Sequence, residues 1–145
     1  MLAVKTYTHD YIDACRARID AQLDAYDTLA AAVAKSQSPE ARAALAALAA
    51  FEPLLFNSLA LVLDASFVHR TRAVEGKDGN PLNEVRMISD SLLANDGALA
   101  ANNTIKYRPE AAVLQLDIGD DISLDAAAFR ALASAYFDEL QRRFT

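Results

Sequence analysis

The stretch Ala43–Val68 most limits what this chain can fold into, because it is apolar almost throughout. Its charged residues are Glu52 and Asp64, and its first third is mostly alanine, which is only weakly hydrophobic. Acids within a weakly hydrophobic stretch are unfavourable in lipid, so we expect two packed helices and no membrane span. Proline inside a helix loses a hydrogen bond and clashes with the preceding turn, so Glu52-Pro53 predicts a kink or a break.

Helical periodicity covers most of the chain. Apolar residues recur at three- and four-residue steps, and polar residues that can cap a helix precede four of the periodic segments. The predicted helices are His9–Ala34, Pro39–Ala50, Pro53 to about Ala73, Pro81 to a stop at Asn95-Asp96-Gly97, and Ala126–Arg142, with Thr8, Ser38, Asn80 and Asp125 as N-caps. The helix that starts at Pro53 is apolar nearly all round from Leu54 to Val68, so we expect it to be central and the most buried.

The pattern changes to alternation between Ile105 and Leu124, which is typical of strands. Gly119-Asp120 has the composition of a tight turn and predicts a hairpin. The predicted fold is therefore a mostly helical α+β domain. It would hold a bundle of four to five helices and a small antiparallel hairpin or three-stranded sheet before the C-terminal helix, in a single domain covering residues 1–145.

Size and charge limit the class of function. A chain of 145 residues suits one domain. The single cysteine excludes an intramolecular disulfide, and no signal-peptide core is visible at the N-terminus, so we expect a cytoplasmic protein. The net charge of −6 argues against a nucleic-acid partner.

One segment, His69–Arg86, stands apart from this packing sequence because polar residues crowd around two glycines and a proline. It holds four basic and three acidic residues and so carries +1, whereas the rest of the chain carries −7. If the two flanking segments fold back on each other, their charged ends converge. Arginines would then hold a carboxylate or phosphate. We therefore predict a site for a small anionic or polar ligand, with Asp64, Arg70, Arg72, Lys77, Asn80 and Arg86 as binding residues.

Chemistry at such a site would need a proton carrier, and His69 and Glu84 are the candidate catalytic residues. Known catalytic and metal motifs do not fit the chain. Neither histidine has the Glu-x-x-His spacing of di-iron bundles, and Asp78-Gly79-Asn80 lacks the later ligands of a calcium loop. We predict no metal and no cofactor, and the sequence leaves open whether any reaction is catalysed.

Two alternatives compete with ligand binding. In the first, the same charged residues form a structural network of ion pairs and caps that holds a demanding loop. In the second, the chain is a homodimeric interaction or scaffold module with no catalytic role. The apolar helices after Pro39 offer more hydrophobic surface than the short elements around them can cover, and surplus of this kind favours a two-fold dimer.

Overall fold

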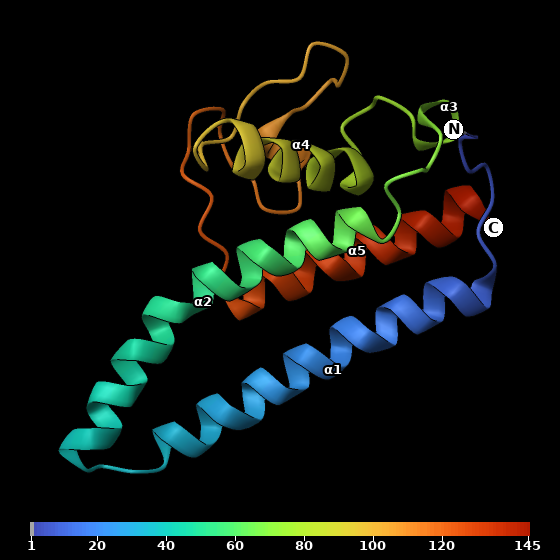
Figure 1. Ribbon diagram of the computed structural model, residues 1–145. Coiled ribbons are helices and arrows are strands. Elements are labelled where there is room, and N and C mark those ends of the chain that lie inside the picture. Colours follow the sequence, from blue (N-terminus) through green and yellow to red (C-terminus); the bar gives the residue numbers. More distant parts are fainter. Residues whose placement is uncertain (1) are drawn as a thin grey trace.

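The computed structural model describes residues 2–145 and is built of helices. In chain order they are α1 (His9–Ala34), α2 (Pro39–Ala65), the single turn α3 (Arg72–Glu75), α4 (Pro81–Ala94), the short 3₁₀ helix η1 (Pro109–Ala111) and α5 (Ala126–Phe144). Helices α1, α2 and α5 pack side by side, and α4 packs across α2 and α5 (Figure 1). The predicted helical bundle is confirmed.

Four of the five predicted helix starts are confirmed, because local chemistry determines them. The predicted start at Pro53 is wrong, since Pro53 lies inside α2. The side chains of Thr8, Ser38, Asn80 and Asp125 each accept a hydrogen bond from a backbone N–H group in the first turn of the helix that follows. These N–H groups have no partner within the helix, so a short polar side chain just before it satisfies them. Proline occupies the first position of α2 and α4, where its missing N–H costs nothing.

Helix α2 differs from the prediction in its length and its end. Pro53 lies inside one continuous helix, which changes direction in its middle third (Figure 1), so the proline bends the helix without breaking it. The predicted continuation to Ala73 is wrong, since α2 ends at Ala65. Beyond it the backbone pairs with the N-terminal segment: Val4 donates to the His69 carbonyl at 2.7 Å, and Thr71 donates to the Val4 carbonyl at 2.8 Å.

The predicted sheet is wrong. Within residues 2–145 there are no strands, only isolated bridges between Val4 and Arg70 and between Ala98 and Asp121. Gln115 has a φ of +55°, which ends any extended run through the expected hairpin. The alternating apolar residues instead belong to an irregular segment, residues 98–125, that packs against the helices. Of these, Ile105, Ile122 and Leu124 are buried in the core.

Aromatic side chains from several helices fill the core. The Tyr26 ring lies edge-on to Phe56 at 5.0 Å between centroids, and Phe56 stacks on Phe129 at 5.5 Å. At the other end of the bundle, Phe67 meets Tyr136 and Phe137 edge-on. The second half of α2 therefore lies in the core, as expected, whereas its first half does not.

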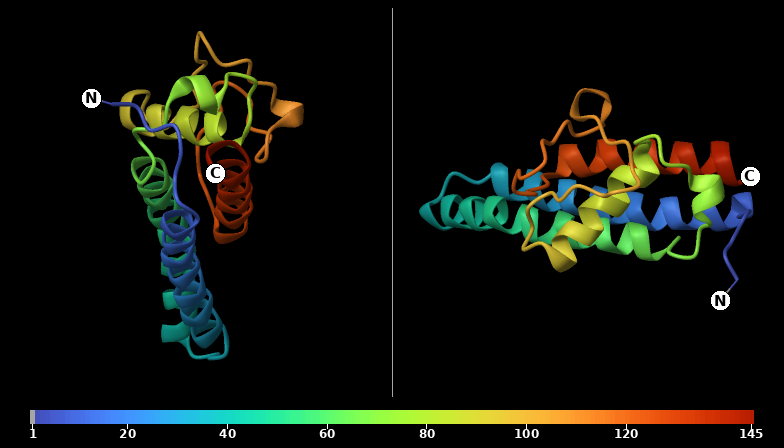
Figure 2. Two further views of the ribbon diagram at one scale, coloured as in Figure 1. Left: turned by 90° about the vertical axis from the view of Figure 1, so that its right-hand side faces the viewer. Right: turned by 90° about the horizontal axis from the view of Figure 1, so that it is seen from above.

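The first half of α2 and the end of α1 form an arm, residues 27–55. In both views the arm extends beyond the end of α5 and the rest of the bundle (Figures 1 and 2). Its sequence is rich in alanine and leucine, yet no side chain in 27–55 is buried. The arm therefore leaves a large apolar surface open, and this is the kind of surplus that the sequence predicts for the helices after Pro39.

Candidate functional site

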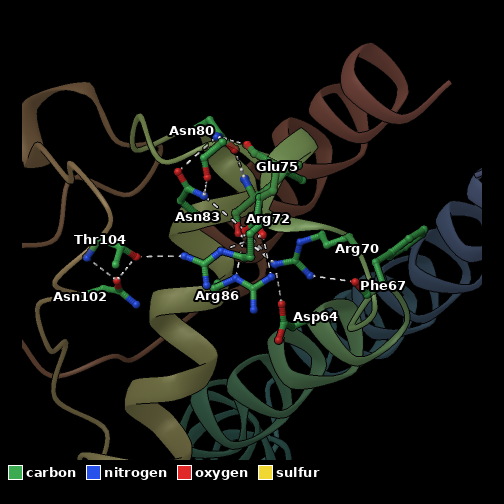
Figure 3. A network of polar contacts seen from close by, with 12 residues as sticks. Asp64, Phe67, Arg70, Arg72, Glu75, Asn80, Asn83, Arg86, Asn102 and Thr104 are labelled. Atoms are coloured by element: carbon green, nitrogen blue, oxygen red, sulfur yellow. Dashed lines mark hydrogen bonds and ion pairs between the residues drawn. The ribbon is translucent and has the colours of Figure 1, made fainter. Parts of the chain in front are cut away.

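The carboxylate of Glu75 is the centre of a charged cluster (Figure 3), at the end of the molecule where α3 lies (Figure 1). Glu75 is fully buried in α3. Arg86 from α4 grips it with two hydrogen bonds, Nε to Oε1 at 3.0 Å and Nη2 to Oε2 at 2.6 Å. Arg70 Nη2 lies 3.3 Å from Oε1 and Asn83 Nδ2 donates to it at 3.2 Å. Paired arginine–carboxylate bonds of this kind are among the strongest polar contacts in proteins.

Arg70 joins this cluster to α2. Its guanidinium group is buried, and Nη2 lies 2.9 Å from Oδ1 of Asp64 near the end of α2. It also donates to the carbonyls of Phe67 and Leu82, at 3.1 and 3.2 Å. The group lies over the Tyr136 ring, 5.6 Å from its centroid. Since Asp64 is on α2 and Glu75 is gripped by Arg86 on α4, Arg70 fixes α4 against α2.

Arg72 lies at the edge of the cluster and is 39% exposed. Its Nε is 3.6 Å from Oε2 of Glu75, and its Nη2 donates to the Thr104 hydroxyl at 3.2 Å. Thr104 in turn donates through its hydroxyl to Oδ1 of Asn102 at 2.9 Å (Figure 3). Arg72 therefore connects the buried carboxylate to the irregular segment.

Two asparagines hold the loop between α3 and α4. Asn80 Nδ2 donates to the Glu75 carbonyl at 2.8 Å, and Asn83 Nδ2 donates to the Gly76 carbonyl at 3.0 Å. Gly79 donates its N–H to Asn83 Oδ1 at 3.0 Å. Gly79 has a φ of +85°, and a Cβ there would lie 2.6 Å from the Lys106 carbonyl oxygen. This position therefore requires glycine for its conformation and for its space.

A side chain from the C-terminal helix also holds the loop between α3 and α4. Arg143 of α5 donates to the Glu75 carbonyl at 3.1 Å and to Asp78 Oδ2 at 3.0 Å. Hydrogen bonding from Asn80, together with the charge of Arg143, holds the pKa of the Asp78 carboxyl below its usual value. The loop is thus fixed from α4 and from α5.

The structure brings together five of the predicted binding residues: Asp64, Arg70, Arg72, Asn80 and Arg86. It does not bring the other predicted residues to the same place. The His69 side chain is exposed and makes no hydrogen bond with residues 2–145, although its carbonyl accepts from Val4. Lys77 is likewise exposed, and its carbonyl accepts from Lys106.

Glu84, the other predicted catalytic residue, lies outside the cluster and binds the irregular segment 98–125. Its buried carboxylate accepts the backbone N–H groups of Val113 and Leu114, both at 2.9 Å. Burial raises the pKa of this carboxyl, while the two N–H donors oppose the shift. Glu84 is therefore the anchor of the irregular segment on α4, and no contact joins it to the His69 side chain.

The sequence predicted none of the cluster residues that lie outside His69–Arg86 on the C-terminal side. Arg143, Thr104 and Asn102 reach it from elements far along the chain, and nothing in their local pattern indicates it. Glu75 and Asn83 lie within His69–Arg86 and were identifiable. Asn83 and Arg86 are three residues apart and so share one face of α4, but several acids lie near the arginines in sequence, and no local signal selects Glu75 as their common partner.

A second feature is apolar, in contrast to the charged cluster, and it lies on the exposed outer face of α2. Ala44, Ala47, Phe51, Leu54, Ser58, Leu61 and Ala65 follow one another at alternating steps of three and four residues. This is the spacing of a coiled-coil seam, which we call the α2 seam. The buried residues of α2, Phe56, Leu59, Ala60 and Leu63, lie on the other side of the helix. The seam carries no charge, and its Phe51 and Leu54 are 47% and 67% exposed.

A groove of about 440 Å³ runs along the seam. Leu54, Ser58 and Leu61 form one wall, and Leu92 of α4 and Ile122 form the other. By length and composition alone α2 also qualifies as a membrane span, because its most apolar window has a mean hydropathy of 1.8 with 22% of that window buried. The outer face of α2 is thus an uncovered apolar surface with a groove beside it.

Comparison of the chain with known protein families, with curated protein sequences and with solved structures found no match.

Proposed function

We propose that this protein is an interaction module that pairs with a second copy of itself through the α2 seam. The observation that carries the proposal is a three-heptad, uncharged seam on the exposed face of a helix whose other face lies in the core from Phe56 to Leu63. Helices with apolar residues at this spacing pack against each other by inserting side chains into the gaps of the facing helix. The seam has the pattern of such a contact, and within residues 2–145 its Phe51 and Leu54 stay 47% and 67% exposed.

The order of residue sizes along the seam favours an antiparallel, two-fold pair. A two-fold axis near Leu54, the middle of the seam, places Leu54 opposite its own copy. Phe51 then lies opposite Ser58, and Ala47 opposite Leu61, so on either side of the axis a large side chain meets a small one. Ser58 lines the groove between α2 and α4. Phe51 of each copy would therefore enter the groove of the other. A symmetric contact of this type is self-complementary, as two-fold interfaces must be.

The charged cluster stabilises the geometry of this contact without taking part in it. The groove needs a fixed second wall, and Leu92 on α4 provides it. The path Asp64–Arg70–Glu75–Arg86 ties α2 to α4 through buried ion pairs. In this proposal the cluster is structural: it sets the distance between the helices that form the groove.

The expected dimer is of moderate affinity. Burying an exposed Leu, Phe or Val side chain completely contributes ~1.5–3 kcal/mol. Phe51 and Leu54 in the seam, and Val62 beside it next to Leu61, are each about half exposed or more. About 1 kcal/mol therefore remains for each, or ~6 kcal/mol for the three in both copies. The alanines and Leu61 add to this gain, and ordering costs subtract from it. We therefore expect dissociation in the micromolar range.

Charge favours a second copy over other occupants. A surface that binds anionic lipid or nucleic acid carries lysine and arginine around its apolar centre. The seam has none, and the chain as a whole carries a net charge of −6. Alanine makes up much of the arm and adds little to lipid insertion. An uncharged helix face fits best against another uncharged helix face.

Sedimentation equilibrium over a wide concentration range tests the proposal. Wild type should change from the mass of one chain to twice that mass as the concentration rises through the micromolar range. Leu54→Glu should remain a single chain, because two carboxylates would meet at the axis. Leu93→Glu is the matched control: Leu93 is also exposed, but it lies on α4 away from the seam, and this variant should pair like wild type.

A charge swap makes the test specific for the two-fold geometry. Leu54→Lys alone should also fail to pair, whereas an equimolar mixture of Leu54→Lys and Leu54→Glu should form a mixed dimer. The proposal is wrong if wild type keeps the mass of one chain at all concentrations, or if Leu54→Glu pairs as well as Leu93→Glu. Binding of wild type to neutral lipid vesicles in place of pairing would identify the bilayer as the occupant instead.

A further inference from the structure

Helix α1 has an uncharged face of its own beside α2. Its members repeat at alternating steps of three and four residues, which is also the spacing of the α2 seam: Gln22, Ala25, Leu29 and Ala32. We call this row the α1 face. With 3.6 residues per turn, the acids of the same stretch, Asp20, Asp24 and Asp27, lie on the opposite side of the helix. The α1 face is open to solvent, and its Leu29 is 52% exposed.

A groove of about 260 Å³ lies between the α1 face and α2. Its lining side chains are Gln22, Ala25, Tyr26, Leu29, Phe51 and Leu55. Tyr26 forms the floor, because its ring is buried and packs edge-on against Phe56. Phe51 is also a member of the α2 seam, and Leu55 directly follows Leu54. The groove is therefore continuous with the surface through which we propose that two copies pair.

The arm lacks the charged surface that exposed helices usually have. Residues 28–34 of α1 and 43–51 of α2 include no charged side chain, and α5 does not extend over the arm (Figures 1 and 2). Helices that are apolar all round are normally covered by other structure, whereas surface helices carry charge on the outer side. Both helices of the arm, and not α2 alone, therefore have the composition of a covered surface.

The α2 seam alone is small for a stable contact. A large apolar side chain that is half exposed presents on the order of 100 Å² to solvent. Phe51, Leu54 and Val62 together then offer roughly 300 Å², whereas a stable interface buries about 800 Å² on each partner. Leu29 and the groove beside it are the apolar surface that continues from the seam on the α1 side. A contact that includes them comes closer to the size that pairing needs.

We infer that two copies pair through α1 as well as α2, so that the α1 face of each copy covers the groove of the other. This inference rests on the proposed pairing through the α2 seam. In an antiparallel pair with a two-fold axis near Leu54, the α1 side of one α2 helix stays next to the α1 side of the other. The two grooves then adjoin across the axis, because Phe51 and Leu55 lie within one turn of it. The contact is formed by four helices, α1 and α2 of each copy.

Charge at the tip of the arm favours a second copy over a bilayer. Lys35, Glu40 and Arg42 lie where α1 connects to α2, and all three are exposed. These residues would have to enter the lipid first if the arm inserted, and charged side chains within a bilayer are costly. They do not line the groove, so in a pair of copies they stay in water.

Sedimentation equilibrium of two matched variants tests the inference. Leu29→Glu should weaken pairing at least tenfold, because a carboxylate from each copy would be buried in the contact. Ala31→Glu is the control. Ala31 is exposed on the same helix, two residues further on and on the side away from the groove, so this variant should pair like wild type. Both positions are exposed, and circular dichroism should show the same helix content for both variants.

Tryptophan fluorescence reports directly on the groove. The chain has no tryptophan, so Leu29→Trp and Ala31→Trp each carry a single reporter. As the concentration rises through the range in which the chain pairs, the emission of Leu29→Trp should move to shorter wavelength, because the indole ring leaves water. The emission of Ala31→Trp should stay where it is.

The outcomes separate this inference from the proposed function. If wild type pairs, Leu54→Glu does not, and Leu29→Glu pairs as well as Ala31→Glu, the α2 seam stands and the inference is overturned. An emission of Leu29→Trp that does not move while the chain pairs also overturns it. Loss of pairing in Leu29→Glu but not in Leu54→Glu would support the α1 contact and contradict the seam. If wild type never pairs, both fail, and a shift of Leu29→Trp on neutral lipid vesicles would then assign the groove to a bilayer.

Discussion

Replacing Glu75 with glutamine should destabilise the protein severely, because among the residues that the structure describes this carboxylate alone accepts from both Arg70 and Arg86. Glu75 is fully buried. Glutamine keeps one oxygen and places an amide NH₂ group against the donors of Arg86, one of which now lies 2.6 Å from Oε2. The cluster also loses one of its negative charges. Removing one partner of a buried ion pair costs about 3–5 kcal/mol, because the other charge stays buried.

This loss is large compared with the whole stability of a domain, about 5–15 kcal/mol. At ~2–4 °C for each kcal/mol in a chain of this size, the melting temperature should fall by roughly 6–20 °C. Calorimetry and urea unfolding at one fixed protein concentration measure it. Glu110→Gln is the control, since Glu110 is exposed and lies 3.8 Å from Arg108. It should change stability by less than ~0.5 kcal/mol.

A double-mutant cycle isolates the cause. Arg86→Gln should cost less in the Glu75→Gln protein than in wild type, because it then removes a charge that is already without its partner. A Glu75→Gln protein within ~1 kcal/mol of wild type would refute the reasoning, and so would an Arg86→Gln cost that is the same in both backgrounds.

Two further changes test the anchor and the loop. Glu84→Gln should cost about 1–3 kcal/mol, because one oxygen replaces two and a backbone donor such as that of Leu114 loses its acceptor. Burial raises the pKa of Glu84 above the usual 4.5, so between 4.5 and the raised value the native state binds more protons than the unfolded state. Urea melts at several pH values should therefore show wild-type stability falling, relative to Glu84→Gln, as the pH rises through that window; parallel curves would contradict this. Gly79→Ala should cost ~1–3 kcal/mol more than Gly97→Ala, because both glycines have positive φ but only a Cβ at Gly79 meets backbone, the Lys106 oxygen at 2.6 Å. Equal losses in thermal melts would show that the close approach does not matter.

Helix starts were predictable from the sequence because each depends on a few adjacent residues. Thr8, Ser38 and Asp125 precede periodic segments and accept the free N–H groups there. The end of α2 was not predictable in this way. It depends on the backbone pairing of Val4 with residues 69–71, and Val4 comes from more than sixty residues earlier in the chain.

The prediction of strands was wrong for a similar reason. Alternation around Ile105 and Ile122 reflects single side chains that enter the core from an irregular segment. Helix side chains hold that segment in place of a strand ladder. Asn57 forms hydrogen bonds with the backbone of Ile122 and Leu124, at 2.9 and 3.0 Å, and Glu84 accepts the backbone N–H of Val113 in the middle of the segment. Period alone does not distinguish this arrangement from a hairpin.

About half of the charged cluster could be predicted. The sequence indicated that the segments on either side of the Gly76–Gly79 loop meet, and Arg70, Asn80 and Arg86 do so. It did not indicate that Arg70 and Arg86 converge on Glu75, since an arginine next to several acids has no local preference among them. Only the packing of α4 across α2 selects one.

The pairing of two copies through the α2 seam is the central claim, and intermolecular nuclear Overhauser effects test it most directly. A mixed sample of ¹³C-labelled and unlabelled chains, at a concentration above the dimer dissociation constant, reports only contacts between copies. We expect contacts between the Leu54 methyl groups of the two copies, and from the Phe51 ring to Ser58 and Leu92. A sample that shows no contacts between copies, or contacts only from surfaces away from α2, would contradict the account.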